Sequence, residues 1–234
     1  MKFQNDIEFF MNKMIKREPF VFSRYADGEM FIIKNKELDA SVQIDKWAFN
    51  GQKAFRDELL RSLKHQEDNY YYAISCNCCD PVNSEIYKKL LNVPHERLTF
   101  ANLWINGNYT YFKENIGKVG SVHLITNANA YGRKYPFEVS SFYPIPHNCV
   151  EYYEQDPDRI HSLLNDFVDN AGSGQVFLVA AGALSEILVH KMFQRNPNNC
   201  YVDIGSALDL WTFGKATRPY HNPEHGDALK LCDL

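Results

Sequence analysis

The segment from residue 175 to residue 204 constrains the fold of this chain more than any other. Residues 175–180 form an almost uniformly apolar run, with the length and composition of a strand buried on both faces. Apolar residues then recur at helical spacing from Gly182 to the turn at residues 196–199, and a second apolar run follows at 201–204. Two buried strands joined by a helix predict a right-handed β-α-β crossover, the unit of a parallel sheet.

The same alternation extends over the rest of the chain. Short apolar runs at residues 20–24, 70–75 and 119–126 predict strands, and amphipathic helices are predicted over 6–17, 54–63 and 157–170, the last capped by Asp156. We therefore expect an α/β fold, a Rossmann-like layered domain with a mostly parallel central sheet flanked by helices. With no repeat or linker in view, residues 1–234 are expected to form a single domain. Residues 131–146, which contain three prolines, and the tail at 217–227 are expected to be irregular, as surface loops or as lids.

Composition and charge narrow the classes of partner. The 234 residues are 45% hydrophobic and 23% charged, which suits a globular chain with a substantial core and excludes a disordered one. A formal charge of -4 with scattered Lys and Arg disfavours nucleic acid and anionic membrane surfaces as partners. No apolar run is long enough for a transmembrane anchor and no signal-peptide core is present, so a cytoplasmic location is expected.

Cysteine spacing gives no metal-site signature. Cys76, Cys78 and Cys79 lie close together, and the other three of the six cysteines are isolated along the chain. Because no second cysteine pair completes a set of four ligands, we expect reduced thiols and no soft-metal site.

Polar residues or glycines that could contact a ligand follow four of the five predicted strands. Ligands of open parallel sheets bind outside the carboxyl ends of the strands, so these residues predict a binding site. They are Arg24, Asp27 and Glu29 after the first strand, Asn127 after the third, Gly182 after the fourth, and Asp203, Gly205, Ser206 and Asp209 around the end of the fifth.

The Asp27-Gly28-Glu29 turn is the strongest metal-ligand candidate. Carboxylates are hard oxygen ligands suited to Mg²⁺ or Mn²⁺, ions that commonly lie between a few protein carboxylates and substrate phosphates. Gly182, at a helix start, would suit a diphosphate or serve only close packing. Arg24 and Arg218 would suit phosphate oxygens. The dinucleotide fingerprint and the phosphate-loop Lys are absent, which disfavours NAD-binding and P-loop proteins.

Aromatic and amide residues at 101–109 suggest a surface that contacts a sugar or a base. Trp104 and Asn106 would suit stacking on a sugar or base and hydrogen bonding to an acceptor, although core packing explains the aromatic residues equally well.

Three ordered segments resemble the GT-D-type glycosyltransferases. They are residues 22–29 (Phe-Ser-Arg-Tyr-Ala-Asp-Gly-Glu), residues 203–209 (Asp-Ile-Gly-Ser-Ala-Leu-Asp) with 217–220 (Thr-Arg-Pro-Tyr) after them, and, more loosely, 181–183 (Ala-Gly-Ala). In that family the first motif usually reads Ser-Arg-Tyr/Phe-Gly-Asp-Gly-Glu, and its carboxylates bind the divalent cation that holds the diphosphate of a UDP-sugar. The matching positions are Asp27 and Glu29, and Ala26 replaces the usual Gly.

The resemblance implies a metal-dependent glycosyltransferase that moves a sugar from a nucleotide-diphosphate donor, expected to be a UDP-hexose, to a hydroxyl of a glycan or glycoconjugate. Its cofactor would be Mn²⁺ or Mg²⁺. If the acceptor is membrane-bound, it would bring this otherwise cytoplasmic protein to the membrane surface. A metal-assisted phosphohydrolase of sugar or nucleotide phosphates and a non-catalytic sugar-nucleotide or glycan-binding module remain as alternatives. The expected donor-binding residues are Arg24, Tyr25, Asn127, Gly182, Gly205, Ser206 and Arg218, and the catalytic base is left open among Asp203, Asp209 and Glu186.

Overall fold

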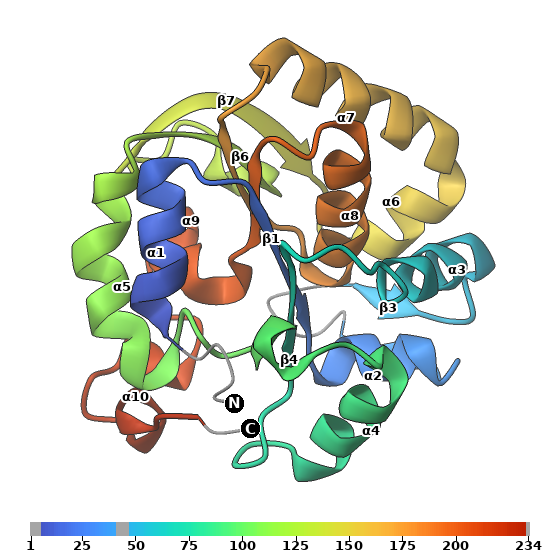
Figure 1. Cartoon of the computed structure of the whole chain (residues 1–234), viewed down its shortest axis with the longest axis horizontal. Coiled ribbons are helices and arrows are strands. Elements are labelled where there is room, and N and C mark those ends of the chain that lie inside the picture. The colour runs from blue at the N-terminus through green and yellow to red at the C-terminus, as the bar shows by residue number, and fades with distance from the viewer. Residues whose placement is uncertain (1–5, 41–46, 233–234) are drawn as a thin grey trace.

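A computed structural model describes residues 6–40 and 47–232. Within these ranges the chain forms a seven-stranded sheet with helices on both faces (Figure 1), in the strand order β5-β4-β1-β9-β8-β6-β7. Every neighbouring pair in this sheet is parallel, which confirms the predicted α/β fold. The strands are β1 (Phe20–Tyr25), β4 (Tyr70–Ile74), β5 (Leu98–Phe100), β6 (Ser121–Asn127), β7 (Glu138–Ile145), β8 (Val176–Ala180) and β9 (Cys200–Asp203), and a separate antiparallel pair joins β2 (Leu38–Asp39) to β3 (Ala48–Phe49).

Two layers of helices enclose the sheet. Figure 1 places α1, α5 and α9 on one side of β1, and α3, α6, α7 and α8 on the other. Residues of α2 and α4 pack into the same hydrophobic cluster as α3 and α8. The helices are α1 (Ile7–Lys16), α2 (Asp27–Ile33), α3 (Lys53–Ser62), α4 (Pro81–Leu91), α5 (Tyr109–Asn115), α6 (Cys149–Gln155), α7 (Pro157–Ala171), α8 (Ser185–Arg195), α9 (Asp209–Phe213) and α10 (Gly226–Leu229).

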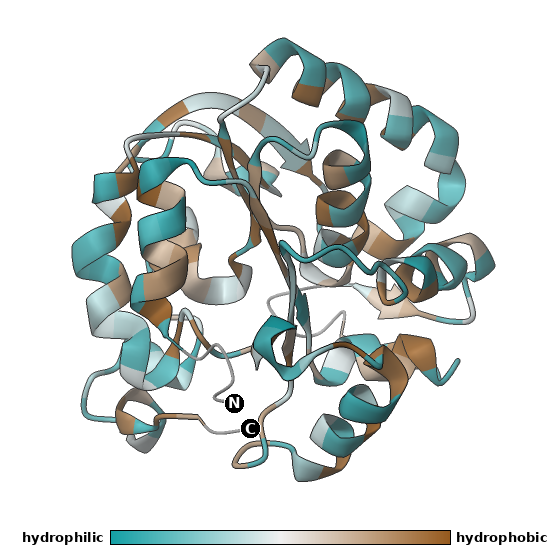
Figure 2. Ribbon diagram, in the orientation of Figure 1, coloured by the Kyte–Doolittle hydropathy of each residue, from teal (hydrophilic) through white to brown (hydrophobic). Residues whose placement is uncertain are grey.

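The central strands are buried on both faces because helices cover both sides of the sheet. Along β8, Val176 and Leu178 belong to the hydrophobic cluster under α1 and α5, whereas Phe177 and Val179 belong to the cluster under α3 and α8. Figure 2 shows the same distribution, with hydrophobic residues along the strands and hydrophilic residues on the outer helix surfaces. The uniformly apolar run in the sequence is thus explained by burial on two sides.

The five predicted strands and four predicted helices are present. Asp156 caps α7 as predicted, because its side chain accepts a hydrogen bond from Arg159 N–H at 3.0 Å. The prediction of an irregular segment at 131–146 is wrong, because β7 lies within it and pairs with β6. Pro144 is compatible with this strand, since β7 is at the sheet edge and needs no donor toward a further neighbour. The short strand β5 was also not predicted, and the tail at 217–227 contains a 3-10 turn, Pro219–His221, and the start of α10.

A crevice lies outside the carboxyl ends of the neighbouring strands β1 and β9. Phe22 of β1 lies opposite Val202 of β9, so both strands deliver the residues that follow them to the same edge. After β1 the chain enters α2, whose Met30 packs in the cluster under α3 and α8. After β9 it enters a 3-10 turn, Gly205–Leu208, whose Ala207 packs in the opposite cluster. Because the two connections leave toward opposite faces, the carboxyl ends of β1 and β9 border an opening of the kind in which α/β proteins bind ligands.

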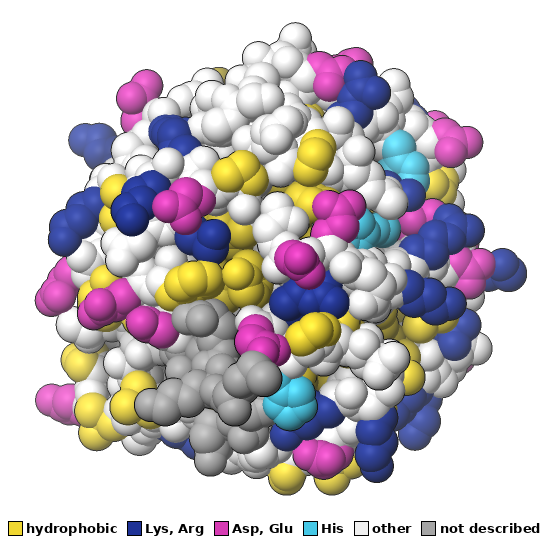
Figure 3. All heavy atoms as spheres, viewed as in Figure 1, with side chains coloured by type: hydrophobic (Ala, Val, Ile, Leu, Met, Phe, Trp, Pro, Cys, Tyr) yellow, Lys and Arg dark blue, Asp and Glu magenta, His cyan; other side chains and the backbone are white. Residues whose placement is uncertain are grey.

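The outer surface carries both kinds of charge. Figure 3 shows basic and acidic side chains distributed over the face in view. In the described parts of the chain, no helix combines the length and apolarity that crossing a bilayer requires.

Candidate functional site

A cavity of about 410 Å³ lies at the carboxyl ends of the central strands. This volume is within the range of about 300–1,000 Å³ typical of small-molecule sites. Segments that are far apart in the sequence meet there, namely those after β1, β6, β8 and β9 and the tail after α9. The predicted residues that line it are Arg24, Asp27, Glu29, Asn127, Gly182, Asp203, Gly205, Ser206, Asp209 and Arg218.

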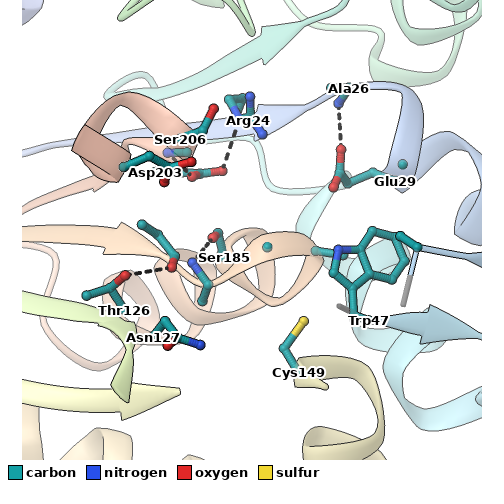
Figure 4. A pocket seen from close by; sticks show the side chains of 18 of the residues that line it. Arg24, Ala26, Glu29, Trp47, Thr126, Asn127, Cys149, Ser185, Asp203 and Ser206 are labelled. Atoms are coloured by element: carbon teal, nitrogen blue, oxygen red, sulfur yellow. Dashed lines mark hydrogen bonds and ion pairs between the residues drawn. The ribbon is translucent and has the colours of Figure 1, made fainter. Parts of the chain in front are cut away.

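Asp27 and Glu29 occupy the first turn of α2. Glu29 is buried, and its Oε2 accepts a hydrogen bond from Ala26 N–H at 2.7 Å (Figure 4), whereas Asp27 is exposed at the cavity. Carboxylates are favoured at this position because the first backbone N–H groups of a helix lack partners within it. The turn therefore presents two acidic side chains to one cavity, from different depths.

The Glu29 carboxylate carries a charge that its surroundings do not fully offset. Burial raises the pKa of Glu29 from its ordinary value of 4.5 to about 7; the nearby charge of Arg24 opposes this rise and that of Asp27 adds to it. A divalent cation would favour the ionised form, so the donor set fits Mg²⁺ or Mn²⁺. In the described ranges no third His, Cys or carboxylate group converges on this pair. Two carboxylates are enough for ions that also bind substrate phosphates and water.

Arg24, which is partly exposed, and the buried Asp203 form an ion pair on the neighbouring strands β1 and β9. Arg24 Nε lies 3.8 Å from Asp203 Oδ2 (Figure 4), and Asp203 Oδ1 accepts a hydrogen bond from Gly205 N–H at 3.0 Å. Gly205 has a φ of +52°, and a Cβ atom there would lie 2.9 Å from Arg24 Cζ. Glycine is thus required at this position both by the backbone conformation and by the close approach of the guanidinium.

A further acid, Glu186, lies close enough to this pair to interact with it electrostatically. Burial, followed by the charges of Glu29 and Asp203, raises the pKa of Glu186 well above its ordinary value. Glu186 is 1% exposed and lies outside the cavity lining. Burial also raises the pKa of Asp203, against the opposing effect of Arg24. Among the described residues, Arg24 Nε, Asp203 Oδ2 and Glu186 Oε2 are buried without a hydrogen-bond partner, so polar atoms beside the cavity remain to be satisfied.

Two side chains of the tail after α9 bond to residues that follow β9, and a third, His221, bonds within the tail. Thr217 Oγ1 donates to Asp209 Oδ2 at 2.5 Å, and Tyr220 is hydrogen-bonded to Ser206 Oγ at 2.8 Å. His221 Nδ1 accepts the backbone N–H groups of residues 217 and 218 at 3.0 and 3.2 Å. These bonds fix the segment that brings Arg218 to the cavity.

Trp47 is a cavity residue that sequence reasoning missed. A Cβ atom on Gly28 would lie 3.2 Å from Trp47 Cζ2, and one on Gly182 would lie 3.3 Å from Trp47 Nε1. The two glycines therefore allow the indole ring to pack between α2 and the start of α8, beside Glu29 and Cys149 (Figure 4). No motif surrounds Trp47 in the sequence, because its place depends on contacts with two distant segments.

Ser185 was also missed. Its Oγ accepts a hydrogen bond from Ala181 N–H at 2.9 Å, which fixes the turn between β8 and α8 at the cavity wall. A Ser three residues after a glycine turn at a strand end is a usable sequence signal for such a local bond.

Besides Glu186, three predicted residues lie away from the cavity lining. Tyr25 is buried and hydrogen-bonded to Ser62 Oγ at 2.7 Å, on the side of α3. Trp104 is 1% exposed, and its ring centroid lies 5.0 Å from that of Phe22. We therefore assign Tyr25 and Trp104 to the core instead of to donor and acceptor binding. Asn106 is buried beside the C-terminal tail, with its Nδ2 3.8 Å from a cysteine sulfur atom.

Comparison with known proteins identifies the fold. No family model and no curated protein matches the sequence. Three solved structures match the fold. A glycosyltransferase (DUF1792) from Streptococcus sanguinis has a TM-score of 0.62 and 13% identity, over 92% of this chain and 85% of that one. A selenomethionine-substituted structure of DUF1792 has a TM-score of 0.60 and 15% identity, with 91% and 87% covered.

The third structure is described as the domain of unknown function 1792 with a distinct glycosyltransferase fold. It has a TM-score of 0.58 and 14% identity, over 95% of this chain and 88% of that one. At identities this low the similarity concerns the fold, and the predicted resemblance to GT-D proteins is confirmed at that level. This chain has the glycosyltransferase fold of the DUF1792 structures.

Proposed function

We propose that this protein is a metal-dependent glycosyltransferase that moves a sugar from a nucleotide-diphosphate donor of the UDP-hexose type to a hydroxyl of a glycan or glycoconjugate. The supporting observation is that Asp27, Glu29, Arg24 and Arg218 line one cavity at the carboxyl edge of a sheet with a glycosyltransferase fold. Carboxylates that suit a divalent cation, next to guanidinium groups that suit phosphate oxygens, match the charge pattern of a metal-bound diphosphate.

Asp27 and Glu29 would hold Mn²⁺ or Mg²⁺, and such an ion, when bound, offsets negative charge on a departing nucleoside diphosphate. Arg218 would contact phosphate oxygens with its planar guanidinium, which the tail hydrogen bonds keep at the cavity. Arg24, on β1 at the cavity wall, would add positive charge while it stays paired with Asp203.

Asp203 is the favoured group for activating the acceptor hydroxyl. It lines the cavity, and burial raises its pKa above the ordinary value, which makes the carboxylate a stronger base. Asp209 also lines the cavity, but its Oδ2 accepts a hydrogen bond from Thr217 that holds the tail. Glu186 lies outside the cavity lining and has a strongly raised pKa. We therefore assign it an electrostatic role beside Arg24 and Asp203, without contact to the substrate.

Calorimetry with UDP tests the metal-dependent donor site. We expect Mn²⁺ to increase the affinity of the wild-type protein for UDP, and Asp27→Ala to remove this increase. Glu37→Ala is the matched control, because Glu37 is an exposed acid outside the cavity and should leave the increase intact. If UDP affinity is independent of Mn²⁺ in the wild type, or the increase persists in Asp27→Ala, the proposed role of these carboxylates is wrong.

An assay of product release separates transfer from the alternative activities. A glycosyltransferase releases UDP from a UDP-sugar, and an acceptor glycan increases that release. Rapid release of inorganic phosphate from phosphate monoesters would instead support a phosphohydrolase. Binding of UDP-sugar without any release across a broad acceptor panel would support a binding module.

A further inference from the structure

Four cysteines from two distant segments converge at one point. Cys76, Cys78 and Cys79 lie in the loop between β4 and α4, and Cys232 follows α10 near the end of the chain. Their four sulfur atoms all lie within 4.8 Å of one another, with 3.4 Å between Cys76 and Cys78 and 3.8 Å between Cys78 and Cys79. The expectation that no further ligand completes this set is wrong, because the fold brings Cys232 to it from the other end of the sequence.

The spacing fits a single tetrahedral ion. A Zn–S distance of about 2.3 Å places the corners of a tetrahedron about 3.8 Å apart, close to the separations observed here. All six cysteines are present as thiols. Thiolates are soft ligands that select zinc over Mg²⁺ or Mn²⁺.

Donor groups surround the sulfur atoms. Asn102 Nδ2 lies 3.5 Å from Cys79 Sγ and 3.8 Å from Cys232 Sγ, and Asn106 Nδ2 lies 3.8 Å from Cys232 Sγ. Lys230 Nζ donates a hydrogen bond to the backbone carbonyl of Cys78 at 3.1 Å, which places a cation at the same cluster. Amide donors and an ammonium group would offset the double negative charge of a zinc ion bound by four thiolates, as outer partners of metal sites commonly do.

We propose that Cys76, Cys78, Cys79 and Cys232 bind one Zn²⁺ ion as a structural site, separate from the Asp27–Glu29 pair. Each coordinating thiol releases its proton to solvent, and no change of oxidation state is involved. The site joins the C-terminal tail to the β4–α4 loop.

The C-terminal tail beside this site packs against the 3-10 turn Asn106–Asn108. Gly107 N–H donates to Lys230 O at 2.9 Å, and a Cβ atom on Gly107 would lie 2.8 Å from Leu231 Cδ2. Asn102 both contacts two of the cysteines and lines the cavity. Zinc bound by the four thiolates therefore positions Asn102 at the edge of the candidate donor site.

Metal analysis of the purified full chain tests this site. We expect about one equivalent of zinc per chain after growth with zinc and purification under reducing conditions, and Zn²⁺ affinity about 100-fold or more weaker in Cys232→Ser. Cys149→Ala is the matched control, because Cys149 lies outside the cluster and should leave the zinc content unchanged. Asn102→Ala, which keeps all four thiols, should weaken Zn²⁺ binding about tenfold.

Substitution with Co²⁺ gives a second readout, since thiolate coordination produces strong charge-transfer absorption that Cys232→Ser should reduce. Circular dichroism establishes that each variant is folded before its metal content is compared. A wild-type protein that stays zinc-free after incubation with excess Zn²⁺, a Cys232→Ser variant with unchanged affinity, or a disulfide among these four residues in the purified protein would overturn the proposal. None of these outcomes depends on UDP binding, so they are distinguishable from a failure of the proposed function.

Discussion

Replacing Glu29 with Gln separates two consequences of a buried carboxylate at the cavity, its cost to folding and its affinity for a cation. The pKa of Glu29 is about 7 in the folded protein against an ordinary value of 4.5. Because one pKa unit corresponds to about 1.4 kcal/mol, ionised Glu29 lowers the free energy of unfolding by about 3 kcal/mol at pH 8. In Glu29→Gln the amide oxygen would still accept the hydrogen bond from Ala26 N–H, and the side chain would carry no charge to bury.

The sign of the pH dependence follows from which state holds the proton. Between pH 4.5 and about 7 the folded state keeps a proton on Glu29 that the unfolded state has lost, so stability falls as pH rises through this window. Below pH 4.5 both states are protonated and the penalty is absent. Glu29→Gln should therefore stabilise the protein by about 3 kcal/mol at pH 8 and by less than about 1 kcal/mol at pH 5.

Urea unfolding at pH 5 and pH 8, without added divalent cation, measures both values. Glu37→Gln is the control, since Glu37 is exposed and should change stability little at either pH. Added Mn²⁺ should raise the unfolding midpoint of the wild type and leave that of Glu29→Gln nearly unchanged. If Glu29→Gln is equally destabilising at pH 5 and pH 8, the reasoning from an uncompensated buried charge is refuted.

Three further substitutions test the backbone beside the ion pair, the phosphate contact and the proposed base. Gly205→Ala should destabilise the fold by about 1–3 kcal/mol in urea unfolding, through its positive φ and the approach to Arg24, whereas Gly226→Ala, with open space around it, should not. Arg218→Lys should weaken UDP binding about tenfold in calorimetry, because Lys lacks the bidentate geometry, and unchanged affinity would exclude that contact. Asp203→Asn should lower kcat at least about 100-fold in a sugar-transfer assay and flatten its pH profile, and an unaltered profile would exclude it as the base.

Local patterns in the sequence were sufficient to predict the central elements. The apolar runs of β1, β8 and β9 reflect burial on both faces, and the Asp156 cap is a contact between residues three apart. The edge strand β7 escaped prediction because half-exposed edge strands tolerate Pro144 and lack a uniform apolar run. Patterns of this kind report on burial, which differs between the centre and the edge of a sheet.

Contacts between distant segments were not predictable in the same way. The sequence showed candidate residues after four of the five predicted strands. Which of them meet depends on β1 lying beside β9, and strand order is not encoded in any local window. Trp47 reaches the cavity only because Gly28 and Gly182 leave space for its ring. Cys232 completes a four-thiol cluster only because the tail returns to the β4–α4 loop.

The balance of buried charge explains why a cation and a diphosphate would bind together. Glu29, Asp203 and Glu186 all have raised pKa values because they are buried near one another, and the guanidinium of Arg24 opposes the rise in each case. A diphosphate alone would add negative charge to a region that already holds excess acid. A divalent ion on Asp27 and Glu29 would reverse this effect, since it lowers the pKa of Glu29 and attracts phosphate oxygens. The increase in UDP affinity that Mn²⁺ produces should therefore be larger at pH 8 than at pH 6, where the ion must first displace the proton of Glu29, and calorimetry at both pH values would measure the difference.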